Sequence, residues 1–156
     1  MPLKFTTGHS TQIGKRDRNE DFCGMVTPDG AELAIKGALF AVADGVSGNG
    51  GGREAAEYTV RGLLADYYAT PETWEISLSL DKVLTAINRW IIAQSAAKKE
   101  FAGMSCTLSL LVLRGNRYFI GHVGDTRVYR LSNNACEKLT QDHVRNRHDM
   151  QHVMKR

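Results

Sequence analysis

A carboxylate and a glycine, Asp44-Gly45, directly follow the uncharged run 38–43. Such a run is typical of a strand buried on both faces, and a carboxylate at its end would be held rigidly at the edge of the core. The glycine lets backbone carbonyl and amide groups approach a ligand closely, and hard divalent cations bind carboxylate and carbonyl oxygens together. An Asp-Gly pair also ends many strands as a plain turn, so this pair alone indicates either a turn or one side of a cation site.

Two further acidic segments border strand-like runs. Glu20-Asp21 opens the strand-like segment 21–27, and Asp125 follows the strand-like run 118–123. Each has a simple alternative, because Glu20-Asp21 could form a solvated turn and Asp125 could cap a hairpin. Carboxylates at the ends of several strands can meet at one end of a sheet, where they would form an oxygen-rich site for Mg²⁺ or Mn²⁺.

These acidic segments belong to a series of short motifs. In chain order they are Arg16-x-x-Asn19-Glu20-Asp21, Phe40-Ala-Val-Ala-Asp44-Gly45-Val-Ser-Gly48, Cys106-Thr107-Leu108, Gly124-Asp125-Thr126-Arg127 and Leu139-Thr140-Gln-Asp142-His143. From about residue 8 to residue 143 this order resembles the metal-dependent serine/threonine protein phosphatases of the 2C type, the PPM family. Residues 65–90 are similar to the bacterial branch in which a phosphatase domain precedes a protein kinase domain. The resemblance implies a signalling hydrolase that acts on phosphoserine and phosphothreonine, with a phosphorylated protein as substrate and a linked or partner protein kinase.

The resemblance also implies a ligand set for two or more Mn²⁺ or Mg²⁺ ions. Asp44 would bridge two ions, while the Gly45 carbonyl and Glu20, the latter through water, would complete the shell of one. Asp21 would hold coordinated water or the phosphate-binding arginine. Asp125 matches an additional, weaker metal position. Two ions about 3.5–4 Å apart can activate a water and orient a phosphoryl group.

Other motif residues have different implied roles. Arg16 would grip the substrate phosphate, for which a planar and permanently charged guanidinium is suited. Asp142 and His143 match an element that is structural rather than catalytic. Val46 stands where some members carry a histidine proposed as general acid, so water or another group would have to protonate the leaving alcohol.

The sequence reaches Arg156 before two late metal-binding aspartate segments of the family. We therefore expect residues 1–156 to form a single PPM-type domain whose C-terminal part is missing, with efficient catalysis in doubt. The alternative is a non-catalytic regulatory module that binds a phosphoprotein or a kinase partner without hydrolysis.

Periodicity predicts the elements that must position these residues. Apolar residues recur at helical spacing over 55–67 and 80–91, separated by Pro71-Glu72-Thr73, so we expect an antiparallel helix pair on a sheet. We expect strands at 4–10, 21–27, 38–43, 107–113, 118–123, 128–131 and 135–139, the last four as a meander. Strands, then helices, then strands indicate an α+β architecture, and the resemblance implies a four-layer αββα sandwich.

Composition agrees with one globular domain. The chain has 156 residues, 42% of them hydrophobic, and no apolar run long enough to cross a bilayer, nor a secretory leader, so we expect a cytoplasmic protein without membrane contact. Its three widely spaced cysteines predict reduced thiols rather than disulfides or a zinc site. The net charge of +3 and the absence of aromatic residues among the basic residues after 144 argue against nucleic-acid binding.

Overall fold

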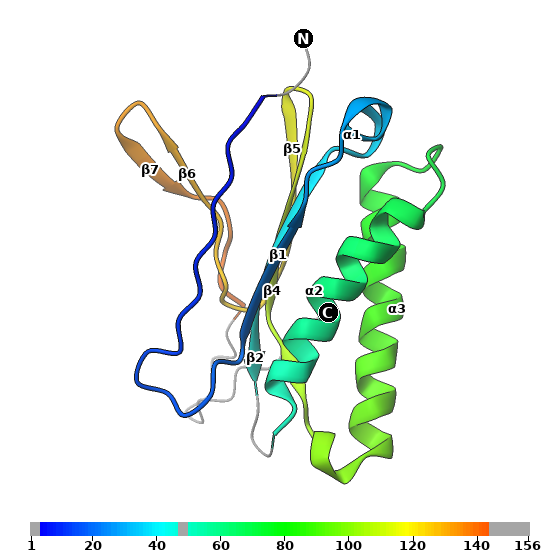
Figure 1. Ribbon diagram of the computed structural model, residues 1–156, viewed down its shortest axis with the longest axis vertical. Helices are drawn as coiled ribbons and strands as arrows, with labels where there is room; N and C mark the ends of the chain where they lie inside the picture. The colour runs from blue at the N-terminus through cyan, green and yellow to red at the C-terminus, as the bar shows by residue number, and fades with distance from the viewer. Residues whose placement is uncertain (1–3, 47–49, 144–156) are drawn as a thin grey trace.

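The computed structural model describes residues 4–46 and 50–143 (Figure 1). The late basic residues and the middle of the glycine-rich loop lie outside this part. The elements are β1 (Asp21–Val26), α1 (Gly30–Lys36), β2 (Ala38–Val46), α2 (Gly52–Ala69), α3 (Ile76–Ala97), a short 3-10 helix (Lys99–Phe101), β3 (Ser105–Cys106), β4 (Leu108–Arg114), β5 (Arg117–Val123), β6 (Tyr129–Ser132) and β7 (Ala135–Lys138). The predicted α+β class is confirmed.

A five-stranded sheet holds the chain together, with β1, β2, β4 and β5 in that order and β3 paired with the end of β2. Neighbouring strands are antiparallel, so β2 and β5 run in the same direction and β1 runs against both. The start of β1, the end of β2 and the end of β5 therefore lie at one edge of the sheet. This is the edge at which the acidic segments were predicted to meet.

The helix pair α2 and α3 covers one face of this sheet, as the helical periodicity predicted (Figure 1). Leu39, Ala41 and Ala43 of β2 face the helices and are buried. Val42 points to the other face and is 47% exposed, so the expectation that this strand is buried on both faces was wrong. The physical reason is that the described helices cover only one side of the sheet, and β2 consequently alternates between buried and open positions.

Three other expectations differ from the structure. Residues 4–10 form no strand; they run as an extended segment along the sheet, where the Phe5 ring packs edge-on against Phe40 with centroids 6.0 Å apart. The helix α1 was not expected, because its sequence follows the turn signal Pro28-Asp29-Gly30 and is short. Strands β6 and β7 do not continue the meander; they form a separate two-stranded sheet on the side away from the helices (Figure 1).

The β6–β7 hairpin has a simple local cause. Asn133 and Asn134 both have positive φ, 48° and 62°, which is the backbone of a two-residue turn whose twist matches the paired strands. Asparagine tolerates this left-handed region better than most residues.

The helix pair is anchored by aromatic side chains. Tyr58 of α2 stacks on Trp90 of α3 with ring centroids 3.4 Å apart. Tyr67 is fully buried and donates a hydrogen bond to the Lys36 carbonyl at 2.7 Å, and burial raises the pKa of Tyr67 to about 12. Within the described ranges no helix has the length and apolar character needed to cross a membrane.

Candidate active site

Asp21 and Asp44 lie directly opposite each other on the paired strands β1 and β2. The pKa of the Asp44 carboxyl is raised above its ordinary value, most of all by partial burial, then by the charges of Asp21 and Asp125. A hydrogen bond to the Asp21 carboxyl and the charge of Glu20 raise it further. These carboxyl groups, from segments far apart in the sequence, are therefore close enough to act on one another.

Asp125 reaches this edge through a tight turn after β5. Gly124 has a φ of 100°, and a Cβ placed on it would lie 2.5 Å from the Thr107 methyl group, so no larger residue fits without displacing Thr107. Thr107 is in turn tied to the end of β2. Its hydroxyl accepts a hydrogen bond from the Asp44 amide at 3.2 Å, and its own amide donates to the Asp44 carbonyl at 2.8 Å. Thr107 thus links the backbone of Asp44 to the turn that carries Asp125.

Gly45 is the point at which helix α2 meets the end of β2. A Cβ on Gly45 would lie 2.2 Å from the Gly52 carbonyl oxygen, so only glycine permits this approach. The Gly45 amide donates to the Glu20 carbonyl at 3.1 Å, which connects the acidic segment before β1 to the end of β2. The sequence predicted a close approach of a ligand to the backbone at Gly45, which stays a prediction; the close approach that the structure shows is that of the main chain at Gly52.

Arg16 lies in the turn before the acidic segment and is exposed. Its amide donates to the Ile13 carbonyl at 3.2 Å, and with the described residues its guanidinium makes no hydrogen bond or ion pair. The predicted role in phosphate binding therefore stays a prediction, although the side chain is accessible.

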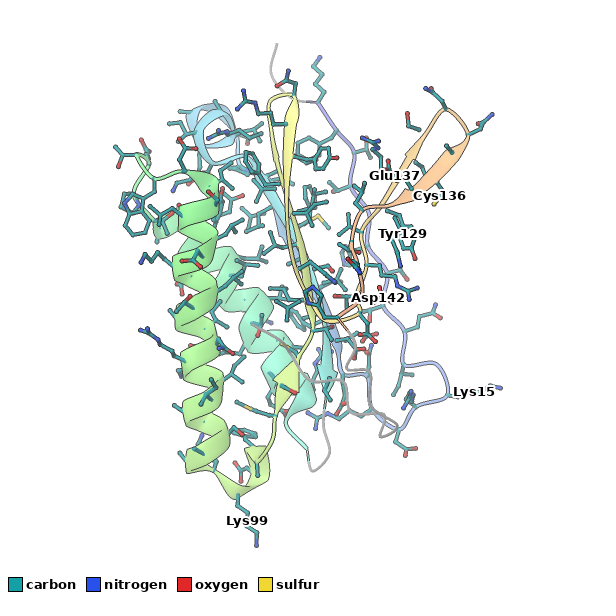
Figure 2. All side chains as sticks on the ribbon, turned by 180° about the vertical axis from the view of Figure 1, so that it is seen from behind. Lys15, Lys99, Tyr129, Cys136, Glu137 and Asp142 are labelled. Atoms are coloured by element: carbon teal, nitrogen blue, oxygen red, sulfur yellow. The ribbon has the colours of Figure 1, made fainter. Side chains whose placement is uncertain are left out.

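Asp142 and His143 make structural contacts, in line with the expectation. Asp142 receives hydrogen bonds on both carboxylate oxygens from Arg127, and it lies toward the base of the β6–β7 hairpin (Figure 2). The His143 amide donates to the Gly124 carbonyl at 2.7 Å. Together these bonds fasten the chain after β7 to the turn that carries Asp125.

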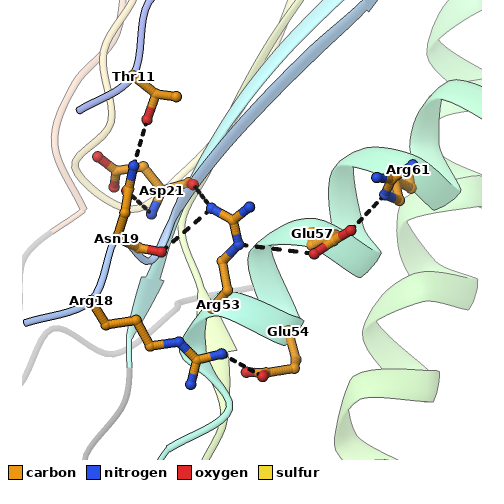
Figure 3. A network of polar contacts seen from close by, with 8 residues as sticks. All are labelled: Thr11, Arg18, Asn19, Asp21, Arg53, Glu54, Glu57 and Arg61. Carbon is orange, nitrogen blue, oxygen red and sulfur yellow. Dashed lines mark hydrogen bonds and ion pairs between the residues drawn. The ribbon is translucent and has the colours of Figure 1, made fainter. Parts of the chain in front are cut away.

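Three residues at this edge were given no role by the sequence. Thr107 is described above, and Asn19 accepts the Asp21 amide on its side-chain oxygen at 3.0 Å. Arg53 of α2 donates to the Asp21 carbonyl at 2.6 Å (Figure 3). Thr107 and Asn19 stand inside the motifs, which was the one available signal, whereas nothing in the sequence connects Arg53 to residue 21.

A divalent cation fits the chemistry of this edge. Its donors are carboxylates and a backbone carbonyl. Burial first, and then the negative charges of Asp21 and Asp125, raise the pKa of Asp44, and a cation would offset both effects. Among residues 4–46 and 50–143, however, no three His, Cys, Asp or Glu side chains are grouped closely enough to form a complete ligand set. The donor types are suitable, but they are not assembled as a finished metal cluster.

Comparisons with known proteins agree with this description. The serine/threonine phosphatase stp of Listeria innocua is 33% identical over 132 residues, which cover 82% of this chain and 50% of that protein. The serine/threonine protein phosphatase PstP of Mycobacterium tuberculosis is 32% identical over 120 residues, 76% of this chain and 23% of the relative. The chain spans half the length of the Listeria relative, and less of the mycobacterial one.

Solved structures show the same fold. The crystal structure of Mycobacterium tuberculosis PstP/Ppp superposes with a TM-score of 0.66 at 29% identity, covering 83% of this chain and 50% of that one. The structure of Stp1 from Staphylococcus aureus gives a TM-score of 0.72 at 23% identity, over 84% of this chain and 50% of that one, a likeness of fold alone. A family model described as Protein phosphatase 2C matches residues 9–154. From its motifs, its fold and this match, the chain belongs to the protein phosphatase 2C family.

Proposed function

We propose that this chain is the part of a metal-dependent protein serine/threonine phosphatase that carries the Asp44 centre. The observation that supports this most strongly is that Asp44 lies opposite Asp21 and is near enough to Asp125 and Glu20 for their charges to act on it, at one edge of the sheet. A fold alone would not indicate an activity, but this group of oxygen donors suits the activity that the relatives' names state.

The chain's own residues have separable tasks in this proposal. Two bound Mn²⁺ or Mg²⁺ ions would supply an activated water and neutralise phosphoryl charge. Asp44 would hold both ions, with Glu20, Asp21 and the Gly45 carbonyl around it and Asp125 beside them. The exposed guanidinium of Arg16 would orient the phosphate of the substrate.

We propose a protein phosphorylated on serine or threonine as the substrate. The partner would then be a protein kinase that phosphorylates the same protein. The three cysteines are free thiols, Cys106 buried among them, which suits a reducing cytoplasm.

One observation favours the alternative of a non-catalytic module that binds a phosphoprotein or a kinase. Among the described residues, no three His, Cys, Asp or Glu side chains are grouped closely enough to hold a metal ion. A protein that holds a phosphoprotein without hydrolysing it would retain Arg16 but would not require cations.

Hydrolysis of para-nitrophenyl phosphate, measured with and without Mn²⁺, separates the two functions. We expect Mn²⁺-dependent turnover in the wild-type chain and turnover at the level of the enzyme-free reaction in Asp44→Ala, because that substitution removes a ligand shared by two ions. Asp66→Ala, an exposed carboxylate elsewhere on α2, is the matched control and should keep its turnover. Wild-type protein that is folded but inactive at every Mn²⁺ concentration would favour the binding module, and normal turnover in Asp44→Ala would exclude the proposed site.

A further inference from the structure

Three consecutive backbone carbonyls in the acidic segment, those of residues 19 to 21, all accept hydrogen bonds from distant parts of the chain. Arg53 donates through Nη1 to the Asp21 carbonyl at 2.6 Å and to the Asn19 carbonyl at 3.4 Å. Between them, the Glu20 carbonyl accepts the Gly45 amide at 3.1 Å. The main chain that carries Glu20 and Asp21 is thus fixed by one arginine of α2 and by the end of β2.

Arg53 is itself held in place from two sides. Its guanidinium carbon lies 5.0 Å from the centre of the Phe22 ring. Its Nε lies 3.9 Å from a carboxylate oxygen of Glu57, one turn further along α2 (Figure 3). A planar guanidinium seated on a ring loses less conformational freedom when it forms hydrogen bonds than a free flexible side chain does.

The other side of the acidic segment is held by Asn19. Its side-chain oxygen accepts the Asp21 amide at 3.0 Å, and its side-chain nitrogen donates to the Thr11 hydroxyl at 2.8 Å (Figure 3). The bond to the Asp21 amide and the two bonds from Arg53 engage main-chain groups of residues 19 and 21, while the bond to Thr11 holds the Asn19 side chain itself. Together they fix the backbone positions from which the Glu20 and Asp21 side chains project.

We propose that Arg53 is a positioning residue for the cation site: by binding the carbonyls on both sides of Glu20, it sets the carboxylates of Glu20 and Asp21 relative to Asp44. The inference rests on the proposed function, since it concerns the same site. Partners that orient metal ligands typically change metal affinity about 10- to 100-fold when they are removed.

Arg61 provides a matched control on the same helix. It lies over the same Phe22 ring, with its guanidinium carbon 5.3 Å from the ring centre, and pairs with the same Glu57 at 2.7 Å. No hydrogen bond joins Arg61 to residues 19 to 21 in the described part of the chain. An effect that comes only from helix charge or from contact with Phe22 should therefore be equal in Arg53→Ala and Arg61→Ala.

The test combines two measurements on the full chain. Electron paramagnetic resonance of free Mn²⁺ gives the affinity for the cation, and hydrogen exchange of the Asp21 and Gly45 amides in metal-free protein gives the order of the segment. For Arg53→Ala we expect Mn²⁺ affinity to fall about 10- to 100-fold and both amides to exchange about tenfold faster or more, because charged hydrogen bonds are lost. Arg61→Ala should match the wild type in both measurements. Arg53→Lys should lie between, since the flexible lysine ammonium lacks the rigid guanidinium whose Nη1 donates to both carbonyls.

The outcomes separate this inference from the proposed function. Equal Mn²⁺ affinity in Arg53→Ala and the wild type would overturn the inference while leaving the phosphatase proposal intact. Absence of Mn²⁺ binding by the wild type would overturn the proposed function, and with it the cation role of Arg53. The exchange data then still decide whether Arg53 holds the segment: unchanged exchange in Arg53→Ala would refute even that.

Discussion

Asp44 combines a structural cost with the chemical role that we propose for it. It stands opposite Asp21 on the neighbouring strand, and like charges in directly opposite positions of a sheet destabilise it by roughly 0.2–1 kcal/mol. Such an arrangement persists when the surrounding structure fixes it, as Thr107 and Gly45 do here through the main chain of residues 44 and 45. Residues that oppose stability in this way are typical of functional sites.

Thr107 supplies the first residue-scale prediction. Its side chain is 3% exposed, and its hydroxyl is the acceptor for the Asp44 amide. Thr107→Val keeps the shape but leaves that amide without its acceptor, so we expect a loss of about 1–3 kcal/mol in the free energy of unfolding, measured by urea denaturation.

Thr107→Ser is the paired variant, because it keeps the hydroxyl and removes only the methyl group that packs on Gly124. We expect it to lose less stability than Thr107→Val. The reverse order would show that the methyl contact, and not the hydrogen bond, holds the two segments together.

At the scale of elements, the base of the β6–β7 hairpin is held by Asp142, which pairs closely with Arg127 and more loosely with Lys138, at 3.7 Å. Arg127 lowers the pKa of the Asp142 carboxyl below its ordinary value of 3.8, mainly through their hydrogen bonds. A carboxyl whose pKa is lowered by folding stabilises the folded state above its ordinary pKa, and this contribution is lost as the pH falls through the lowered value. The hairpin is therefore anchored at neutral pH and should loosen in acid.

We expect this loosening below about pH 4, near the ordinary pKa of an aspartate. Nuclear magnetic resonance of the Leu139 amide, which donates to the Val128 carbonyl at 2.8 Å, would follow it. In Arg127→Gln, the Leu139 amide resonance should already at pH 7 resemble that of the acid-loosened wild type, and lowering the pH should change it less. Arg130→Gln, which breaks the pair with Glu137 inside the hairpin, should respond to pH as the wild type does; equal behaviour of both variants would refute the anchoring role.

The elements differ in how well the sequence predicts them. The helix pair could be predicted because its apolar residues recur at a spacing that places them on one side of a helix and of no other element. The predictions of a strand at residues 4–10 and of a meander that continues into β6 and β7 were wrong, because local alternation indicates an extended chain but not the strand with which it pairs. β6 pairs with the next strand along the chain, β7, but the separation of this hairpin from β5 and the packing of the N-terminal segment depend on contacts distant in sequence.

At the scale of the whole molecule, the largest difference from the sequence-based expectation is that the sheet face away from the helices is partly exposed, whereas burial on both faces was expected. Strand register places Cys23, Met25, Phe40, Val42 and Leu111 on this face, where the described chain covers it only in part. Uncovered apolar surface of this kind binds hydrophobic dyes.

We expect the fluorescence of bound anilinonaphthalene sulfonate to fall in Val42→Thr, because threonine retains the β-branched shape but exposes a hydroxyl. Leu78→Thr on α3 removes a comparably exposed apolar side chain, 40% against 47% exposed, from the helical side. It should leave the fluorescence unchanged. An equal fall in both variants would show that the dye does not distinguish the sheet face.

The position of the candidate site could be predicted because its acidic residues stand at strand ends, which the sequence marks. Asp21, Asp44 and Asp125 follow or open apolar runs, and antiparallel pairing then brings those ends to one edge. The supports could not be predicted in the same way, because Arg53 acts on a main-chain carbonyl 32 residues away, and any residue type would offer that carbonyl. Contacts to the backbone leave no pattern in the sequence of the acceptor.

The pairing of Asp21 with Asp44 has a consequence for how the protein can fail. A slip of β1 by one position along β2 would place Phe22 opposite Asp44 and turn Asp21 toward α2. Cation uptake would then disappear together with the hydrophobic interior, so bound Mn²⁺ would act as a reporter of strand alignment. Molecules that are compact but have this misaligned register would give no signal in an assay of Mn²⁺ binding at Asp44.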